Sequence, residues 1–283
     1  MIVVLAILAA FIPAVLWVWF FYSRDRYERE PKALIVKLFL WGLLAGPWAG
    51  GLNEVVSGIL GPTVERAGNA GLIPLAVALL VVMVGVLALN EETMKYLVST
   101  NSVRSDPNFN ELVDGMIYLS TAALGFAAGE NLLYVIRAYA GSLEETTRGA
   151  AFLFAFGNVA VFRALFNTIG HVTYSGIVGY FLAAHLVGKR PGRVVGVGIL
   201  LATLVHTGWN LSWWLQGIFA PNVRTWWFVD LSWYFVIAMG IEVTGIAIYL
   251  LLLRRALAAS PFRAGQLAGV TAPRPVEETP PAR

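Results

Sequence analysis

Residues 72–97 read LIPLAVALLVVMVGVLALNEETMKYL, an apolar run that ends in two adjacent glutamates and a lysine. An apolar stretch of about 18 or more residues is typical of a helix that spans a membrane. A charged residue at membrane depth costs about 2.5–3.5 kcal/mol on insertion scales, so such residues are usually kept for a function. This stretch therefore predicts a membrane-spanning helix with a candidate functional site at Glu91, Glu92 and Lys95.

The rest of the chain has the same apolar character. Of its 283 residues, 58% are hydrophobic and 13% are charged, whereas a soluble domain carries about 25% charged residues. We therefore predict an all-α fold, a polytopic transmembrane helix bundle with about seven spans. The predicted spans are about Val3–Tyr22, Leu34–Gly58, Leu72–Leu97, Leu112–Ile136, Ala164–Leu186, Val194–Leu215 and Leu231–Leu253.

The remaining segments complete the predicted organisation. Ala150–Val161 is apolar but too short to span, so we expect it to be re-entrant or interfacial on the outer side. Residues 1–258 should form one membrane-embedded domain, because no hydrophilic stretch is long enough for a second core. Residues 259–283 end in PRPVEETPPAR and are predicted to be a disordered cytoplasmic tail.

Lysine and arginine are unevenly distributed between alternate loops. One set of loops, together with the tail, holds Arg24, Arg26, Arg29, Lys32, Arg104, Lys189, Arg190, Arg193, Arg254, Arg255, Arg263, Arg274 and Arg283. The other set holds only Arg66, Arg137, Arg148 and Arg224. Because basic loops stay in the cytoplasm, we predict a multi-pass cell-membrane protein with its N-terminus outside and its C-terminus in the cytoplasm.

Several function classes lack support in the sequence. The net charge of +3 is explained by the basic residues of the predicted cytoplasmic loops. The chain has no basic cluster with interleaved aromatic residues that would indicate a nucleic-acid partner. The chain has no cysteine, which excludes a thiol nucleophile and a Cys-ligated metal. It also lacks the GxSxG, Walker A, HExxH and GxGxxG motifs.

The EExxK motif at residues 91–95 can supply a general base. Adjacent helical residues point about 100° apart, so the two carboxylates should have different partners. One of them can pair with Lys95. A glutamate followed by a lysine four residues later, as in Glu91 and Lys95, is better oriented for an ion pair than the reverse order. The other would be free to activate a water molecule. The alternative is a charge cluster at the end of a helix, at the membrane surface.

Glu130 lies in a second candidate segment, DGMIYLSTAALGFAAGENLLYV at residues 114–135. The glycine and alanine run should allow a neighbouring helix to approach closely. The alternative interpretation of Glu130 is an ion pair with Arg137 or with a basic group on another helix. Asn53, Glu54 and Glu242 are also intramembrane but belong to no motif, so we interpret them as structural pairs.

Two further helices carry polar stripes at intervals of four residues, which place side chains on one helix face. The first stripe is Arg163, Asn167, His171 and Ser175, and the second is His206 and Asn210. Histidine can transfer protons near neutral pH, and a His–Asn pair can donate hydrogen bonds to a developing oxyanion. The alternative is interhelical hydrogen bonding as packing.

At these motifs the chain resembles the PrsW family of intramembrane proteases, within the wider group of CAAX-prenyl and bacteriocin-processing endopeptidases. The resemblance rests on RDRYEREP, EETMKY, DGMIYLSTAALGFAAGENLLYV, FRALFNTIGHVTYSGIVGY and VHTGWN in this order. It implies a multi-helix membrane protease that cleaves membrane-anchored proteins. In the family's best-known setting the target is an anti-sigma factor, which is cut on the outer side.

The resemblance also implies roles for particular residues. Glu91 would be the base on water, with Glu92 and Lys95 completing its motif. Glu130 matches the FxxxE position and His171 the additional histidine of this branch. His206 and Asn210 match the pair that stabilises the oxyanion. Some relatives carry Asp in place of Asn210, which weakens a metal-ligand role there.

The sequence leaves three questions open. Two glutamates and two histidines are possible zinc ligands, but we favour a metal-free scheme and expect no cofactor. The span limits place Glu91 closer to the cytoplasm than Glu130 and His171, so the third helix should be shifted or broken, or one cavity should reach deep into the bundle. The substrate, its cleavage site and the oligomeric state are not determined.

Two other function classes compete with a protease that acts on a membrane-anchored protein within the lipid bilayer. A proton- or ion-coupled transporter would use buried Glu and His residues as relays, but the inverted repeats common in transporters are not seen. A non-catalytic sensor or scaffold is the other. The complete set of Glu91, Glu130, His171 and His206 argues against it, because a scaffold need not bear the cost of insertion.

Overall fold

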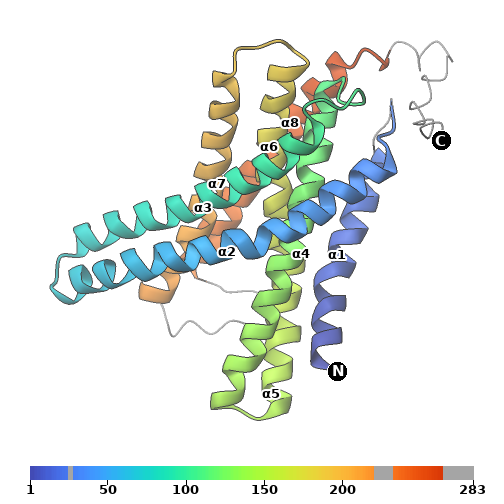
Figure 1. Ribbon diagram of the computed structural model, residues 1–283. Helices are drawn as coiled ribbons and strands as arrows, with labels where there is room; N and C mark the ends of the chain where they lie inside the picture. Colours follow the sequence, from blue (N-terminus) through green and yellow to red (C-terminus); the bar gives the residue numbers. More distant parts are fainter. Residues whose placement is uncertain (25–27, 220–231, 264–283) are drawn as a thin grey trace.

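The computed structural model describes residues 1–24, 28–219 and 232–263, and these form a bundle of helices (Figure 1). The elements are α1 (Ile2–Arg24), α2 (Lys32–Asn69), α3 (Ile73–Val103), α4 (Leu112–Glu145), α5 (Arg148–Phe152), the π-helices η1 (Leu153–Ala160) and η2 (Arg163–Asn167), α6 (Thr168–Leu186), α7 (Arg193–Phe219) and α8 (Trp233–Ala259). Residues 264–283 lie outside the described ranges, so the disorder of the tail stays a prediction.

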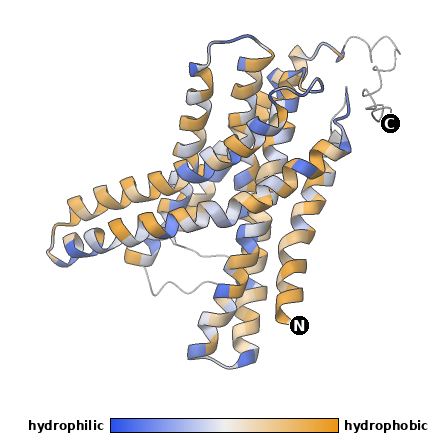
Figure 2. Cartoon of the chain, in the orientation of Figure 1, coloured by the Kyte–Doolittle hydropathy of each residue, from blue (hydrophilic) through white to orange (hydrophobic). Residues whose placement is uncertain are grey.

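Within the described residues, seven helical runs are long and apolar enough to cross a membrane. This confirms the predicted all-α, polytopic class. Large apolar side chains face outward along most of these helices, and polar residues concentrate at the turns (Figure 2). Such a surface suits a lipid environment, because lipid chains solvate apolar side chains but cannot satisfy backbone polar groups.

The second span is longer than predicted. α2 has 38 residues and continues past Gly58 to Asn69, with Pro47 and Pro62 inside it. Its extension is held by packing, since Val56, Leu60 and Val64 lie against the buried Leu80, Met83 and Val84 of α3. Neighbouring helices often allow proline inside a membrane helix in this way.

The segment 150–161 differs from the sequence-based expectation. It is not separate from the next span, because residues 148–186 form one continuous helical run. Its small residues explain this arrangement. Ala155 and Ala160 are buried against Val135 of α4 and Ala6 of α1, so the segment packs along two helices as an extension of α6.

α4 is the central helix of the bundle. In its apolar window 89% of the residues are buried, against 17–39% for the other spans. A Cβ at Gly42 of α2 would clash with the carbonyl of Ala122, and one at Gly115 would clash with that of Gly179 in α6. The small residues of α4 therefore bring two helices into backbone contact, as the glycine and alanine run predicted.

The α2–α3 pair crosses α4 obliquely and diverges from α4 and α6 toward the α2–α3 turn (Figure 1). α3 is unbroken from Ile73 to Val103. The break that was one of the alternatives for the third helix is therefore not present. Both residues line the same cavity.

Candidate active site

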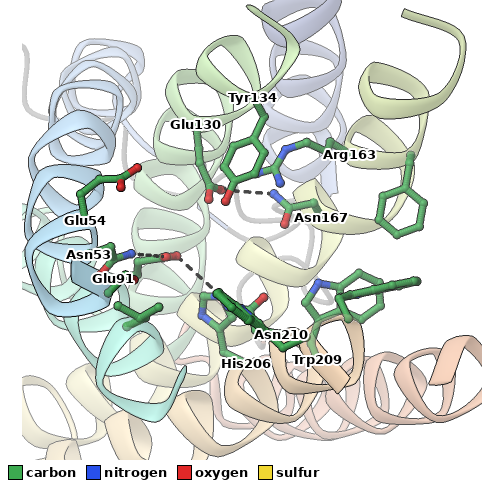
Figure 3. A pocket seen from close by; sticks show the side chains of 15 residues that line it. Asn53, Glu54, Glu91, Glu130, Tyr134, Arg163, Asn167, His206, Trp209 and Asn210 are labelled. Carbon is green, nitrogen blue, oxygen red and sulfur yellow. Dashed lines mark hydrogen bonds and ion pairs between the residues drawn. The ribbon is translucent and has the colours of Figure 1, made fainter. Parts of the chain in front are cut away.

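A cavity of about 440 Å³ lies where α2, α3, α4, η2 and α7 meet (Figure 3). One side is aromatic, with Phe162, Trp209 and Trp213 packed edge to face or stacked on one another. The remaining wall is mostly polar. Its polar residues are Asn53, Glu54, Ser57, Glu91, Glu130, Arg163, Asn167, His206 and Asn210. An apolar side next to a few acids, amides and an imidazole is the kind of lining that can bind and orient a ligand.

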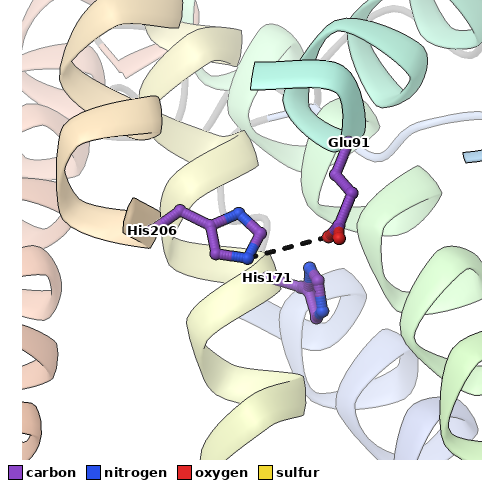
Figure 4. Close-up of side chains that lie close together, drawn as sticks. All are labelled: Glu91, His171 and His206. Carbon is purple, nitrogen blue, oxygen red and sulfur yellow. Dashed lines mark ion pairs between the residues drawn. The ribbon is translucent and has the colours of Figure 1, made fainter. Parts of the chain in front are cut away.

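Glu91 presents one bonded and one free oxygen. Its Oε1 accepts a hydrogen bond of 2.9 Å from Asn53 Nδ2. Its Oε2 is buried, has no hydrogen-bond partner, and lies 3.6 Å from His206 Nε2 (Figure 4). The residue as a whole is only 5% exposed. A buried carboxylate oxygen without a partner is costly in a folded protein and indicates a functional position.

The other glutamate of the motif is fully engaged. Glu92 Oε1 lies 2.6 Å from Lys95 Nζ and 2.9 Å from His206 Nδ1, and its Oε2 accepts a hydrogen bond of 3.0 Å from Ser175 Oγ. The expectation that the spacing of four would favour a Glu91–Lys95 pair is therefore wrong. Lys95 pairs at a spacing of three, because Glu92 faces the bundle interior with it.

Lys95 is completely buried, and its ammonium group has three neighbours inside the protein. Besides Glu92, it lies 3.0 Å from His171 Nδ1 and 4.9 Å from the centroid of the Phe126 ring. A lysine ammonium can only donate, and an aromatic face attracts a cation. The charge is thus satisfied inside the protein, which excludes the alternative of a helix-end cluster at the membrane surface.

These contacts determine the histidine tautomers. Because Lys95 donates, His171 Nδ1 must accept, and its Nε2–H donates to Glu130 Oε2 at 2.9 Å. In the same way, His206 Nδ1–H donates to Glu92. The Nε2 atom of His206 therefore faces Glu91. These assignments are inferred from the hydrogen-bond network.

Glu130 forms an ion pair with a basic residue of another helix, which was one of the two interpretations from the sequence. Arg163 Nη2 lies 2.7 Å from Glu130 Oε2, while Arg137 pairs with Glu54. Arg163 is positioned by the Tyr134 ring, 3.8 Å from its guanidinium carbon, and by Asn131. It lies on η2, and π-helical turns often occur at functional sites.

The three carboxylates of the buried network, Glu91, Glu92 and Glu130, have only two lysine or arginine partners. Lys95 pairs with Glu92 and Arg163 with Glu130. Among the residues that the structure describes, Glu91 has neither. Of the three acids, Glu91 is thus the one whose carboxylate is not paired with a lysine or arginine.

The structure brings together all seven residues singled out from the sequence. Six of them form the connected network of Glu91, Glu92, Lys95, Glu130, His171 and His206. Asn210 lies one turn after His206 in the wall of the cavity. Sequence reasoning left open a basic partner of Glu130 on another helix, and this partner is Arg163 of the predicted polar stripe. It interpreted Asn53 as part of a structural pair and did not connect it with Glu91.

Glu91, His171 and His206 could also be considered as metal ligands, since their candidate ligand atoms lie within 4.8 Å of one another. However, both nitrogens of His171 already have partners, Lys95 and Glu130. Only Glu91 and His206 then offer a free lone pair. Catalytic zinc sites use three protein ligands, so zinc binding by these three residues would require His171 to give up its contact with Lys95 or with Glu130.

Comparisons with known proteins agree on one family. Residues 30–241 match a family model described as PrsW family intramembrane metalloprotease. The chain is 29% identical to the Protease PrsW of Geobacillus kaustophilus (strain HTA426) over 198 residues, 69% of this chain and 73% of that protein. It is 26% identical to the Protease PrsW of Bacillus subtilis (strain 168) over 227 residues, 78% of this chain and 90% of that protein. No solved structure matches the chain.

Proposed function

The chain belongs to the PrsW family of intramembrane proteases, and from this premise we propose that it hydrolyses peptide bonds of membrane-anchored proteins with Glu91 as the base. One observation carries the proposal. Glu91 Oε2 is buried beside the cavity without a hydrogen-bond partner. A general base needs such an acceptor within reach of the water that it activates.

The proposed reaction has two proton transfers. Glu91 Oε2 takes a proton from a water molecule while the water oxygen attacks the carbonyl carbon of the substrate. The C–N bond of the tetrahedral intermediate then breaks, and the proton held by Glu91 passes to the leaving nitrogen. The products are a carboxylic acid and an amine, and Glu91 returns to its starting state.

Asn210 and His206 are proposed to stabilise the negative charge that develops on the substrate oxygen. Asn210 donates from its side-chain amide, and His206 donates from Nε2 when that atom carries a proton. Both residues line the cavity on α7, one turn apart on one helix face. Oxyanion donors act most strongly when they are held in place before the reaction.

The remaining residues are proposed to hold this arrangement. Glu92 fixes the His206 ring through Nδ1, and Lys95 balances the charge of Glu92. His171 connects Lys95 to Glu130, which Arg163 neutralises. The network thereby keeps the reacting groups in position without a hydrogen bond to Glu91 Oε2.

We propose that the reaction needs no metal, so a chelator should leave the activity unchanged. The reason is that His171 is committed to Lys95 and Glu130, which leaves too few ligands for catalytic zinc. The check is peptide cleavage in liposomes with and without a chelator, together with metal analysis of the purified protein. Stoichiometric zinc that disappears in the His171→Ala variant would contradict this expectation.

The substrate class is proposed to be single-span membrane proteins, with an anti-sigma factor as the first candidate. The experiment uses the Glu91→Gln variant as a trap in native membranes, followed by cross-linking and mass spectrometry. Each captured single-span protein is then reconstituted in liposomes with the wild-type chain or with the variant. Cleavage by the wild type alone supports the proposal. If the wild type cleaves no captured protein, the proposed substrate class is wrong.

The proposed orientation places the N-terminus outside and the C-terminus in the cytoplasm. Reporter fusions after Arg29, Asp106 and Lys189 should therefore read as cytoplasmic, whereas fusions after Asn69 and Gly141 should read as external. The physical reason is the excess of lysine and arginine in the first set of loops. An external signal after Arg29 would reverse the topology.

A further inference from the structure

We propose that Asn53 is a positioning residue that directs the reactive proton to Glu91 Oε2. The proposal rests on the role of Glu91 as the base. Asn53 lies on α2 and belongs to no motif. It donates from Nδ2 to Glu91 Oε1 at 2.9 Å, and it accepts at Oδ1 from Asn90 Nδ2 at 2.8 Å. Its amide thus stands between Glu91 and its sequence neighbour Asn90.

The orientation of this amide follows from a backbone carbonyl. Oxygen and nitrogen of an asparagine side chain are normally assigned from their partners. Here Asn90 also lies 3.0 Å from the carbonyl oxygen of Ala49, which can only accept. Asn90 must therefore present its nitrogen to α2. The atom of Asn53 that faces Asn90 must be its oxygen, so the atom that faces Glu91 must be its nitrogen.

Both N–H groups of Asn90 are used in this arrangement, one for Ala49 and one for Asn53. Ala49 and Asn53 are one turn apart on α2, so a single side chain of α3 bridges them. Asn53 cannot rotate its amide without losing the bond from Asn90. Two good hydrogen bonds thereby hold the donor against Glu91 in a partly buried site, where such bonds are strong.

This donor has a consequence for the carboxyl group of Glu91. Oε1 accepts from Asn53 and must offer a lone pair in that direction. The proton taken from water therefore goes to Oε2, the oxygen with no hydrogen-bond partner. Oε2 is also the oxygen that faces His206 Nε2. Asn53 thus keeps the acid form of Glu91 aligned with the oxyanion donors when the leaving nitrogen is protonated.

The decisive comparison is between Asn53→Ala and Asn90→Ala, because neither variant places a charge beside Glu91. Both remove the Asn53–Asn90 hydrogen bond that joins α2 to α3, but only Asn53→Ala removes the donor to Glu91. If Asn53 only joins two helices, the two variants should be equally impaired. If Asn53 positions Glu91, turnover of Asn53→Ala should fall about 10- to 100-fold, the range expected when a reacting group is misplaced or loses its orienting partner.

The probe is the single-span protein that the wild-type chain cleaves, reconstituted in liposomes. We expect Asn53→Ala to lower kcat with KM unchanged, because the interaction acts only on the reacting group. Asn90→Ala should lower kcat less. It should add nothing in the Asn53→Ala background, since the two residues act in series. Asn69→Ala makes the same chemical change at the far end of α2 and should leave turnover unchanged.

Each outcome decides the proposal. Wild-type kcat in Asn53→Ala, equal losses of kcat in Asn53→Ala and Asn90→Ala, a change in KM alone, or additive losses in the Asn53→Ala/Asn90→Ala pair would overturn it. If Asn53→Ala does not accumulate in the membrane, Asn53→Leu, which is uncharged and similar in size to asparagine, takes its place in the comparison with Asn90→Ala. Full activity in Glu91→Gln would instead refute the role of Glu91. The two failures are therefore distinguishable.

Discussion

The Glu91→Gln variant is expected to fold and insert normally and to lose cleavage by about 10²–10⁴-fold, the usual contribution of a general base. Glutamine fits the contacts of the site. Its oxygen can accept from Asn53, as Glu91 Oε1 does at 2.9 Å. Its nitrogen would take the place of Oε2 and point to His206 Nε2, 3.6 Å away. The variant would thus keep the shape and lose the proton acceptor.

The measurement is the rate of product formation from a captured single-span protein in liposomes. Thermal stability in detergent is measured in parallel to establish that the variant is folded. Glu144→Gln makes the same change on an exposed position of α4 and serves as the matched control. Near-normal turnover by Glu91→Gln would remove this residue as the base.

The Lys95→Met variant is expected to lose about 3–5 kcal/mol of folding free energy, the loss typical of removing one partner of a buried ion pair. The Lys95 and Glu92 side chains are both fully buried, with 2.6 Å between Nζ and Oε1. Without the ammonium, the Glu92 carboxylate would keep only His206 and Ser175 as partners. His171 would also lose the donor at its Nδ1 atom.

A second substitution separates the charge effect from the loss of packing. In the Lys95→Met/Glu92→Gln variant both buried charges are removed, so thermal stability should recover most of the loss. Its cleavage should stay low, because the His206 ring loses its charged partner. Unfolding in detergent and the amount of protein in the membrane are the two readouts. Full stability of Lys95→Met alone would show that the pair is not needed for the fold.

Several features of this protein could be predicted from local sequence. The apolar runs predict membrane spans because insertion depends on about 20 consecutive side chains, with no need to know their neighbours. The cost of a charge in a membrane likewise marks Glu91, Glu130 and His206 as candidates without any structure. The spacing of four also correctly placed His171 and Ser175 on the side of their helix that faces the site.

Other features depend on how the helices cross. Local spacing favoured a Glu91–Lys95 pair, but the interior position of Lys95 beside His171 and Phe126 selects Glu92. Local length suggested a separate segment at residues 150–161, but packing along α4 and α1 joins it to α6. Neither outcome could be predicted, because each is decided by side chains that are distant in the sequence.

The sequence by itself determined the membrane class, the seven spans and the set of candidate residues. The tertiary structure alone decided which carboxylate stays free and which residues hold it. Close backbone contact at Gly42 and Ala122 joins α2 to α4, and the packing of α2 on α3 brings Asn53 to Glu91. The α2–α3 pair crosses α4 obliquely (Figure 1). Hydropathy and helical periodicity are properties of one segment, whereas a crossing angle is set by the packing of two surfaces.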